Sequence, residues 1–367
     1  MSVTTLPSTQ ATADSTERVS WARYSEFLGT DYFPGIDGLR AVSVLLVMCN
    51  HVAHPPSLTG WIKGWTGVHV FFVISGFLIT TLLLREEERN GRVSLRNFYL
   101  RRVFRILPVY FAVLSLYLLI CHTPMGAAKW AQLREGLPYY LSFLQEYRPD
   151  SVGTVFGHSW SLGVEEKFYL VWPFLFFVVL LRWRGSLARL LPISAVMVAL
   201  AVFGSHNLCR SYFGIAVGCT LAVVMHVPRT QNFVLKLAAV PTPLVIASVA
   251  TTYLLICAIG DAAVLLFDFA IALLIVHLLI NRGLTRSAMS HPAMIWLGKR
   301  SYSMYLVHVL CINAVEKVIH PSGAFGFAVV IAVSYAITAL FSHLLYVVIE
   351  RNCISYGRKL TAKARAI

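Results

Sequence analysis

The chain alternates between long apolar runs and short polar connections over most of its 367 residues. A helix needs about 20 mostly apolar residues to cross the hydrocarbon core of a bilayer. Applied along the chain, that requirement predicts an all-α, polytopic membrane helix bundle of about ten transmembrane helices. The ten predicted segments are residues 36–53, 67–84, 102–121, 165–183, 191–204, 210–227, 242–259, 262–280, 301–319 and 325–348.

Composition supports this fold class and excludes others. Hydrophobic residues make up 57% of the chain and charged residues only 13%, whereas a soluble domain carries about 25% charged residues. The net charge of +14 does not indicate nucleic acid, because the Lys and Arg residues lie between apolar runs rather than on one wettable face. The seven cysteines are scattered singly without a CxxC pair, so we expect buried thiols, with neither disulfides nor a metal site.

Basic residues predict the orientation of the bundle. Most of the 31 Lys and Arg residues fall in connections on one side, and such connections stay in the cytoplasm, together with both termini. Residues 1–35 are rich in Ser and Thr and lack the apolar stretch of a signal peptide. We therefore predict a flexible cytoplasmic arm, a membrane domain over 36–350 and a basic cytoplasmic tail over 351–367. The long outer connection, residues 122–164, is a candidate lid or acceptor-facing loop.

Titratable side chains collect on the predicted outer side of the membrane. His51 ends the first segment, His69 begins the second, and the others, His158, Glu165 and Glu166, lie at the start of the fourth. Helix ends near lipid headgroups are wet, so a purely structural role is an equal alternative for any one of these residues. The two glutamates are harder to explain in that way, because a carboxylate at the mouth of a spanning helix is costly unless it is paired or hydrated.

An arginine cluster lies on the predicted inner side, in the stretch RNFYLRRVFRILPVY. It contains Arg96, Arg101, Arg102 and Arg105. The positive-inside bias alone would explain a basic connection here. However, every cation in the stretch is arginine, whose guanidinium pairs with phosphate through two parallel hydrogen bonds. The functional interpretation is therefore a site for a phosphate-bearing anion on the cytoplasmic side.

Arg40 and His51 stand at opposite ends of the first predicted helix. Between these two positions an ideal helix rotates to within about 20° of three full turns and rises about 16 Å along its axis. Both side chains therefore share one face, which we expect to look into the bundle. An arginine that snorkels to the headgroups and a histidine that caps the helix would produce the same geometry. Asp268 and His277 also share a face, on the eighth segment, but no role for them follows from the sequence.

Six motifs in this order resemble acyltransferase family 3, the bacterial integral-membrane enzymes that acylate surface polysaccharides, lipopolysaccharide, nodulation factors and some macrolides. The motifs are IDGLRAVSVLLVMCNH, GVHVFFVISGFLITTLLL, FYLRRVFRILPVYF, HSWSLGVEEKFYLVWPF, WLGKRSYSMYLVH and LLYVVIER. Together they cover nearly the whole chain after the arm. The resemblance implies a ten-helix bundle in the bacterial inner membrane that takes acetyl-CoA, or another acyl-CoA, as its donor substrate without a bound cofactor.

The resemblance also implies roles for individual residues. His51 takes the position of the catalytic histidine, Arg40 that of its paired arginine, and Glu166 the acidic position of the fourth motif. Arg102 and Arg105 match the arginine pair associated with donor binding. The complete donor-binding candidates are Arg101, Arg102 and Arg105, and the acceptor-side candidates are His69, His158 and Glu165.

The chain departs from the family pattern at three places. His69 stands where the family commonly has Asp, which leaves the role of this position open. Lys167 stands where Gln is common, and we expect it to alter the pairing of Glu165 or Glu166. The chain also ends about 19 residues after its last predicted helix, so it corresponds to the form without the hydrolase-like domain of many members.

The predicted reaction moves an acyl group from a thioester to a hydroxyl of a cell-surface or lipid-linked glycan. A hydroxyl is a poor nucleophile without a base, and histidine titrates near the working pH. His51 would either deprotonate the acceptor or carry the acyl group itself, with Glu166 orienting the imidazole. A small secreted glycolipid or a macrolide is the alternative acceptor. A transporter or flippase, and a membrane scaffold without catalysis, are the alternatives from other classes.

Overall fold

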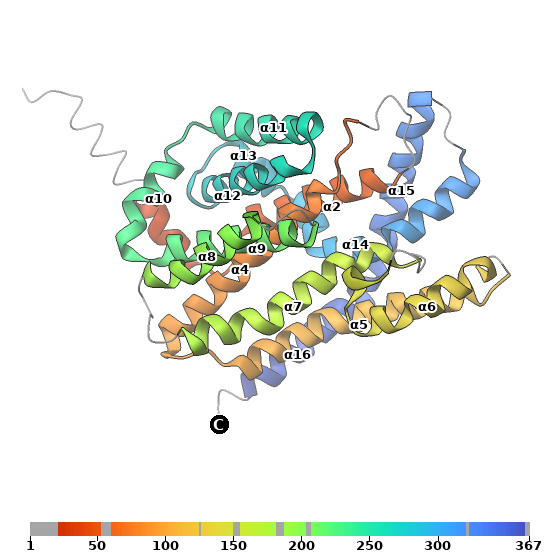
Figure 1. Ribbon diagram of the computed structural model, residues 1–367, viewed down its shortest axis with the longest axis horizontal. Helices are drawn as coiled ribbons and strands as arrows, with labels where there is room; N and C mark the ends of the chain where they lie inside the picture. The colour runs from red at the N-terminus through yellow and green to blue at the C-terminus, as the bar shows by residue number, and fades with distance from the viewer. Residues whose placement is uncertain are drawn as a thin grey trace, which may run out of the picture.

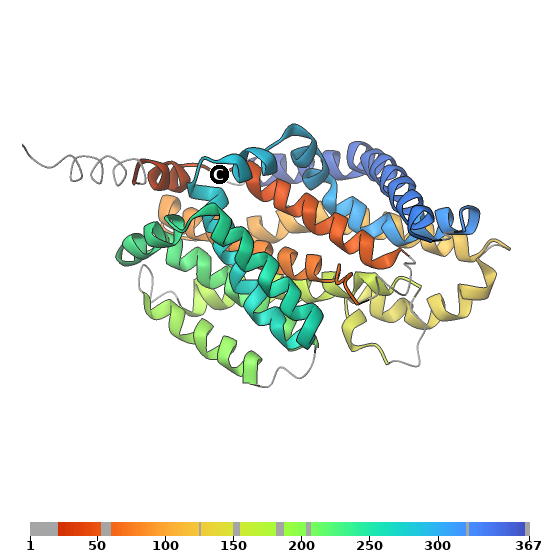
Figure 2. The ribbon, with the colours of Figure 1, turned by 90° about the horizontal axis from the view of Figure 1, so that it is seen from above.

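The computed structural model describes residues 21–52, 60–124, 126–149, 155–180, 187–202, 207–320 and 323–363. Within these ranges the chain is helical and forms no β-strand. The long helices lie alongside one another in an elongated bundle (Figure 1 and Figure 2). The predicted all-α bundle is therefore confirmed.

Each predicted segment overlaps a helix of the described ranges. By length and composition, six helices of the described ranges can cross a membrane, or seven if the bent pair Trp21–Gly29 and Pro34–His51 forms one span. Ten is thus an upper figure, since two of the helices have only 15 and 13 residues and neither Pro34–His51 by itself nor Pro292–Val318 is among the six. The helices are α2 (Pro34–His51), α4 (Thr66–Asn90), α5 (Leu95–Cys121), α7 (Trp160–Phe174), α8 (Leu190–Val202), α9 (Asn207–His226), α11 (Thr242–Ile259), α12 (Val264–Ile280), α14 (Pro292–Val318) and α15 (Gly323–Leu345), with the short helices α10 (Gln231–Ala238) and α13 (Leu284–Met289) in connections.

Two glycines allow α4 and α9 to pack closely. A Cβ atom on Gly76 would overlap the carbonyl oxygen of Ile215, and one on Gly218 would overlap the carbonyl oxygen of Val73. Small residues at such positions let the backbones of membrane helices approach, which strengthens van der Waals packing where the hydrophobic effect contributes little. α4 also packs against α2, and α2 packs against α14. The helices that carry the candidate site are therefore held together at the centre of the bundle.

The second part of the predicted flexible arm is instead helical. The helix Trp21–Gly29 is bent by 77° from α2, and its Tyr24 and Phe27 are only 1% and 2% exposed. The buried Arg85 of α4 donates a hydrogen bond to the carbonyl oxygen of Phe27 at 2.7 Å. Aromatic residues at helical spacing thus supply an apolar face that packs on the bundle, which the Ser and Thr content of the arm concealed. Residues 1–20 lie outside the described part of the chain.

The long outer connection also contains a helix, α6 (Trp130–Leu141). Its Leu133 and Tyr140 are fully buried, and the Tyr110 hydroxyl of α5 donates to the Tyr140 carbonyl at 2.9 Å. Lys167 of α7 closes the same region through an ion pair with Glu146. This connection is therefore packed against the bundle by α5 and α7, at the end opposite to the helix Trp21–Gly29 in Figure 1.

The predicted basic tail is an amphipathic helix, α16 (Arg351–Lys363). It continues from α15 through the π-helical segment η9 (Tyr346–Glu350), and it packs against α5. The Tyr356 ring lies 5.2 Å from the Phe104 ring of α5. The C-terminal part of the described chain is thereby placed beside the arginine-rich start of α5, as the ribbon shows (Figure 1).

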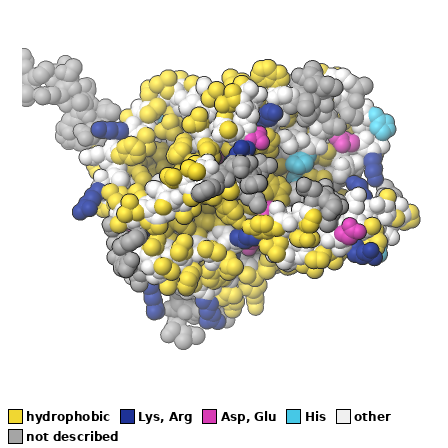
Figure 3. Space-filling view, viewed as in Figure 1, with side chains coloured by type: hydrophobic (Ala, Val, Ile, Leu, Met, Phe, Trp, Pro, Cys, Tyr) yellow, Lys and Arg dark blue, Asp and Glu magenta, His cyan; other side chains and the backbone are white. Residues whose placement is uncertain are grey.

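The outer surface is apolar. Hydrophobic side chains are spread across the face drawn in Figure 3, with scattered charged side chains between them. On α11 only Val245 and Ile256 of the 18 residues are buried. An outward apolar surface of this extent matches a lipid bilayer, since water would make it an aggregation site. The chain is a multi-pass membrane protein.

We expect Gly218→Ala to destabilise the bundle, because the added methyl group would overlap the Val73 carbonyl. Overpacking of this kind lowers the free energy of unfolding by about 1–3 kcal/mol. Thermal unfolding of the detergent-purified protein measures the effect. Gly283→Ala is the matched control, since nothing lies within 4 Å of a Cβ atom there. Equal unfolding temperatures for both variants would contradict the role of Gly218.

Candidate functional site

A cavity of about 630 Å³ lies between α2, α4, α5, α7, α14 and the η9–α16 segment. Tyr32, Lys299 and Arg358 line it and are exposed, so they form its rim. Ser161 and Tyr305 also line it and are only 5% and 6% exposed, so they form its base. The cavity therefore leads from the arginine-rich end of the bundle into its interior.

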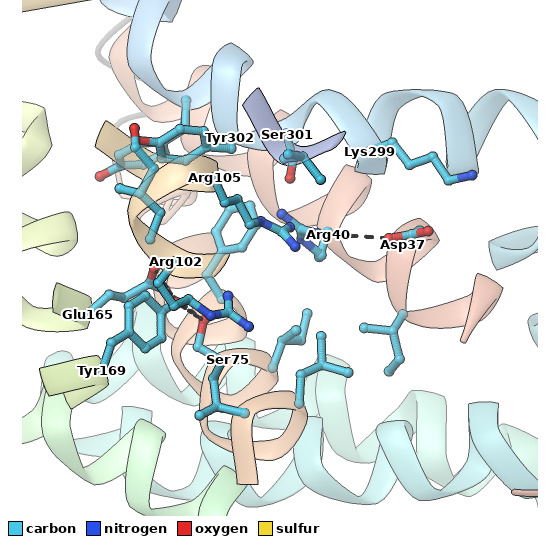
Figure 4. Close-up of a pocket in the computed structure, with 18 of the residues that line it drawn as sticks. Asp37, Arg40, Ser75, Arg102, Arg105, Glu165, Tyr169, Lys299, Ser301 and Tyr302 are labelled. Carbon is cyan, nitrogen blue, oxygen red and sulfur yellow. Dashed lines mark hydrogen bonds and ion pairs between the residues drawn. The ribbon is translucent and has the colours of Figure 1, made fainter. Parts of the chain in front are cut away.

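Three arginines share this cavity. Arg40 of α2 and Arg102 and Arg105 of α5 point into the same space in Figure 4. Arg105 interacts electrostatically with both of the others, and these like charges repel. Arg40 has a long ion pair with Asp37 at 3.8 Å, and the Arg102 guanidinium carbon lies 5.2 Å from the centre of the Tyr169 ring. Cations that converge in a partly buried space favour an anionic ligand.

Two glutamates of the cavity are held by hydroxyl groups. Glu165 accepts hydrogen bonds from the Ser75 hydroxyl at 2.8 Å and from the Tyr169 hydroxyl at 3.0 Å. Glu350 of η9 accepts one from the Ser303 hydroxyl at 2.6 Å. No ion pair joins either carboxylate to an arginine of the cavity within the described residues. Arg102 and Arg105 thus keep their donors free, within the described residues, for an incoming group.

The structure separates Arg101 from the other two donor-binding candidates. Arg101 donates to a carboxylate oxygen of Glu86 at 3.1 Å, whereas Arg102 and Arg105 line the cavity. Residues three apart share one helix face, and a neighbouring residue points about 100° away from it. The arginine-rich stretch therefore divides into a cavity face and a face that pairs with α4.

The rim is anchored by two arginines of α4. Arg89 donates to both carboxylate oxygens of Asp31, at 2.8 and 2.9 Å, and these hydrogen bonds lower the pKa of the Asp31 carboxyl. Arg85 lies 3.6 Å from the same carboxylate. Beside this anchor, the Lys299 ammonium nitrogen lies 5.1 Å from the centre of the Tyr32 ring. The rim thus offers an aromatic ring next to a basic side chain.

A histidine cluster lies beyond the base of the cavity. Nδ1 of His51 is 3.3 Å from Nε2 of His308, and the His158 ring is 5.0 Å from the His308 ring. Tyr305 lines the cavity, and its ring lies 5.6 Å from the His308 ring. The Tyr305 hydroxyl donates to the main-chain carbonyl of His158 at 2.5 Å. Tyr305 therefore belongs both to the cavity and to the cluster.

Other predicted members of the outer group lie elsewhere. Glu165, predicted beside the histidines, lines the cavity with the arginines. Nδ1 of His69 is 3.2 Å from a carboxylate oxygen of Asp268, and both residues are buried. His277 has a different partner from His69: its Nε2 lies 2.8 Å from the Thr242 hydroxyl. Only His51 and His158 of the predicted outer group meet in one cluster.

Glu166 makes no hydrogen bond or ion pair with His51 in the described part of the chain. It interacts electrostatically with Glu165, Arg102 and Lys167. Lys167 is directed to Glu146 rather than to either neighbouring glutamate. The ring of His51 is held instead by His308 and by the main chain of α2.

Sequence reasoning assigned no role to His308 or Tyr305. The only signal was the motif WLGKRSYSMYLVH, which contains both residues. Helical spacing on α14 could not reveal that this stretch faces both His51 and the cavity, because that depends on how α14 packs against α2.

The chain is similar to known proteins over most of its length. Residues 33–347 match the model of an acyltransferase domain family. The chain is 29% identical to a peptidoglycan O-acetyltransferase of Listeria monocytogenes, over 78% of this chain and 50% of the relative. It is 28% identical to provisionally named relatives: a peptidoglycan O-acetyltransferase of Bacillus subtilis, over 89% and 55%, and an O-acetyltransferase of Staphylococcus aureus, over 89% and 58%. The chain spans about half the length of these curated relatives. No solved structure matches it.

We expect the His69–Asp268 pair to be energetically coupled. His69→Leu leaves the Asp268 carboxylate buried without its hydrogen-bond partner, and breaking a buried pair costs about 3–5 kcal/mol. The double variant His69→Leu/Asp268→Leu removes both polar groups and should recover part of that loss. Chemical unfolding of the two single variants and the double variant in detergent measures the coupling. Strictly additive effects would show that the two groups do not interact.

Proposed function

Because the chain belongs to the acyltransferase family whose domain model it matches, we propose that it transfers an acyl group, most simply acetyl, from acyl-CoA to a hydroxyl of a cell-surface or lipid-linked glycan at the bacterial inner membrane. Relatives named as O-acetyltransferases support the acetyl group and the glycan acceptor. The observation that carries the proposal is the cavity, whose arginine-lined opening leads inward to Tyr305, and the Tyr305 ring packs beside His308 of the histidine cluster.

The arginine end of the cavity suits the phosphate groups of CoA. Arg40, Arg102 and Arg105 present guanidinium forks inside it, and Lys299 and Arg358 add two cations at the rim. Charge-assisted hydrogen bonds from guanidinium groups are the strongest contacts that a protein offers to phosphate. The basic side of the bundle is also the predicted cytoplasmic side, where acyl-CoA is available.

The interior of the cavity suits the uncharged arm of CoA. Apolar side chains such as Phe72 and Ile79 line it together with the hydroxyl groups of Ser161 and Tyr305. An extended amide-containing chain would place its thioester next to Tyr305, whose ring faces His308 and so the histidine cluster. The donor and the acceptor would then approach His51 from opposite sides of the membrane.

In the proposed reaction His51 is the general base. Its free ring nitrogen takes the proton of the acceptor hydroxyl while the hydroxyl oxygen attacks the thioester carbonyl. The carbon–sulfur bond breaks, the CoA thiolate leaves, and the imidazolium returns the proton to the sulfur. The products are the acyl ester and CoA. If His51 carries the acyl group itself, CoA is released in a burst before any acceptor is added.

Because the chain belongs to an acyltransferase family, it is an enzyme, and the transporter and scaffold alternatives are no longer needed. The acceptor class is tested by mass spectrometry of surface glycans from cells with and without the protein. An acetyl increment that disappears with the gene supports a glycan acceptor. Unchanged glycans together with acyl transfer by the purified protein to a small glycolipid would reassign the acceptor.

We expect Arg102→Gln and Arg105→Gln to raise the KM for acetyl-CoA by about tenfold each, because each removes one charge-assisted hydrogen bond worth about 1.5–3 kcal/mol. Steady-state kinetics of the purified protein measure this change. Arg96→Gln is the matched control, since Arg96 lies on the same helix, is exposed and does not line the cavity. If all three variants keep the wild-type KM, the arginines serve orientation in the membrane only.

We expect His51→Ala to lower the rate of acyl transfer by at least about 100-fold, the usual contribution of a general base. Release of CoA from labelled acetyl-CoA in the presence of a glycan acceptor measures the rate. His320→Ala, at an exposed histidine, controls for the loss of an imidazole. Wild-type activity in correctly inserted His51→Ala protein would refute the catalytic assignment.

A further inference from the structure

His308 and His51 form a contact between a buried ring and an exposed ring. Nε2 of His308 on α14 lies 3.3 Å from Nδ1 of His51 at the end of α2. The ring centres are 4.7 Å apart and the ring planes cross at 76°. His308 is fully buried, whereas His51 is exposed. The exposed ring can therefore meet a substrate while the buried ring supports it from behind.

The main chain determines the hydrogen positions of His308. Its Nδ1 lies 2.6 Å from the carbonyl oxygen of Tyr305. A carbonyl oxygen only accepts hydrogen bonds, so Nδ1 carries the hydrogen. A neutral His308 then presents the lone pair of Nε2 to His51.

The same reasoning applies to His51. Its Nδ1 lies 2.9 Å from the carbonyl oxygen of Val47, one helical turn earlier, so Nδ1 again carries the hydrogen. That hydrogen faces both the Val47 carbonyl and the Nε2 lone pair of His308. The remaining nitrogen of His51, Nε2, has the free lone pair and makes no hydrogen bond within the described part of the chain.

We propose that His308 is the positioning residue of the transfer reaction, an inference that rests on the proposed function. His308 holds the His51 ring with Nε2 directed at the acceptor hydroxyl. When Nε2 takes the hydroxyl proton, the Nδ1 hydrogen stays in place and is accepted by His308, which stabilises the imidazolium. The proton then passes from Nε2 to the CoA sulfur. His308 itself neither gains nor loses a proton in the cycle.

This arrangement uses an imidazole where Ser-His-Asp enzymes use a carboxylate. The carboxylate that the sequence offered for this role, Glu166, makes no hydrogen bond to His51 in the described residues. A neutral partner suits a site inside an apolar bundle, because an unpaired carboxylate there would be costly.

The neighbouring titratable groups leave the contact undisturbed. Nε2 of His158 donates to the main-chain carbonyl of Leu306 at 3.0 Å, and the Tyr305 hydroxyl donates to the main-chain carbonyl of His158. The Tyr117 ring of α5 lies 6.3 Å from the His158 ring. His158 and Tyr305 thus have hydrogen-bond acceptors of their own, and Nε2 of His308 remains available to His51.

The first experiment compares His308→Phe with His308→Gln in the full-length protein. Phenylalanine fills the space but cannot accept a hydrogen bond, whereas the side-chain oxygen of glutamine can. We expect His308→Phe to lower kcat by about 100-fold with an unchanged KM for acetyl-CoA, and His308→Gln to stay within about tenfold of the wild type. Equal losses in both variants, or a rise in KM alone, would overturn the proposal.

The second experiment does not depend on turnover, so it separates this proposal from the proposed function. Iodoacetate alkylates either ring nitrogen of histidine, and the two products of His51 can be distinguished after digestion. We expect alkylation at Nε2 only in the wild type and in His308→Gln, and at both nitrogens in His308→Phe, where the ring can turn. The same Nε2 selectivity in all three proteins would show that His308 does not position His51. If His308→Phe loses the Nε2 selectivity but the wild type transfers no acyl group, the proposed function is refuted, whereas the positioning of His51 by His308 is supported.

Discussion

Charged and polar groups inside an apolar bundle are costly unless they are paired, and this constraint governs where every buried ionisable side chain lies. Arg189 donates to both carboxylate oxygens of Glu87, at 2.8 and 2.9 Å, and both side chains are buried. His69 and Asp268 are paired between α4 and α12. These pairs join segments that lie far apart in the chain.

The same constraint acts on the charged side chains of the cavity, but there, within the described residues, the arginines and glutamates do not pair with one another. Arg40, Arg102 and Arg105 share one space and repel one another, while Glu165 and Glu350 are bound by hydroxyl groups instead. Such an arrangement is unfavourable by itself, and the phosphate groups of the proposed donor would balance it. The proposed function thus uses the region where like charges meet. Electrostatically perturbed groups cluster at functional sites in general.

One helix connects the two halves of the proposed reaction. α2 carries Arg40 into the cavity and His51 into the histidine cluster. Gly298 of α14 lies directly against the main chain of Asp37, so α2 and α14 are in close contact at the cavity end, and His308 meets His51 at the other. Because α2 and α14 pack along their length, a shift of either helix would disturb donor and base together.

Local pattern was sufficient to predict most of the fold. Apolar runs placed a helix at each of the ten predicted segments, since a helix in lipid must satisfy its own main chain wherever it lies. The prediction was wrong where local composition indicates disorder but the side chains pack on the bundle. The Ser and Thr content of the arm indicated disorder, but Trp21, Tyr24 and Phe27 recur at helical spacing and are buried or partly buried.

The sequence by itself determined the fold class, the basic side of the bundle and the chemical types of the site: arginine for an anion, histidine for a proton. The tertiary structure decided which of these residues meet. It separated Arg101 from Arg102, paired His69 with Asp268 and brought His308 to His51 across 257 positions of sequence. Helical periodicity tells which residues share a face, but the partner of that face depends on how the helices pack. That packing is set by side-chain shape and by close glycine contacts far apart in the chain.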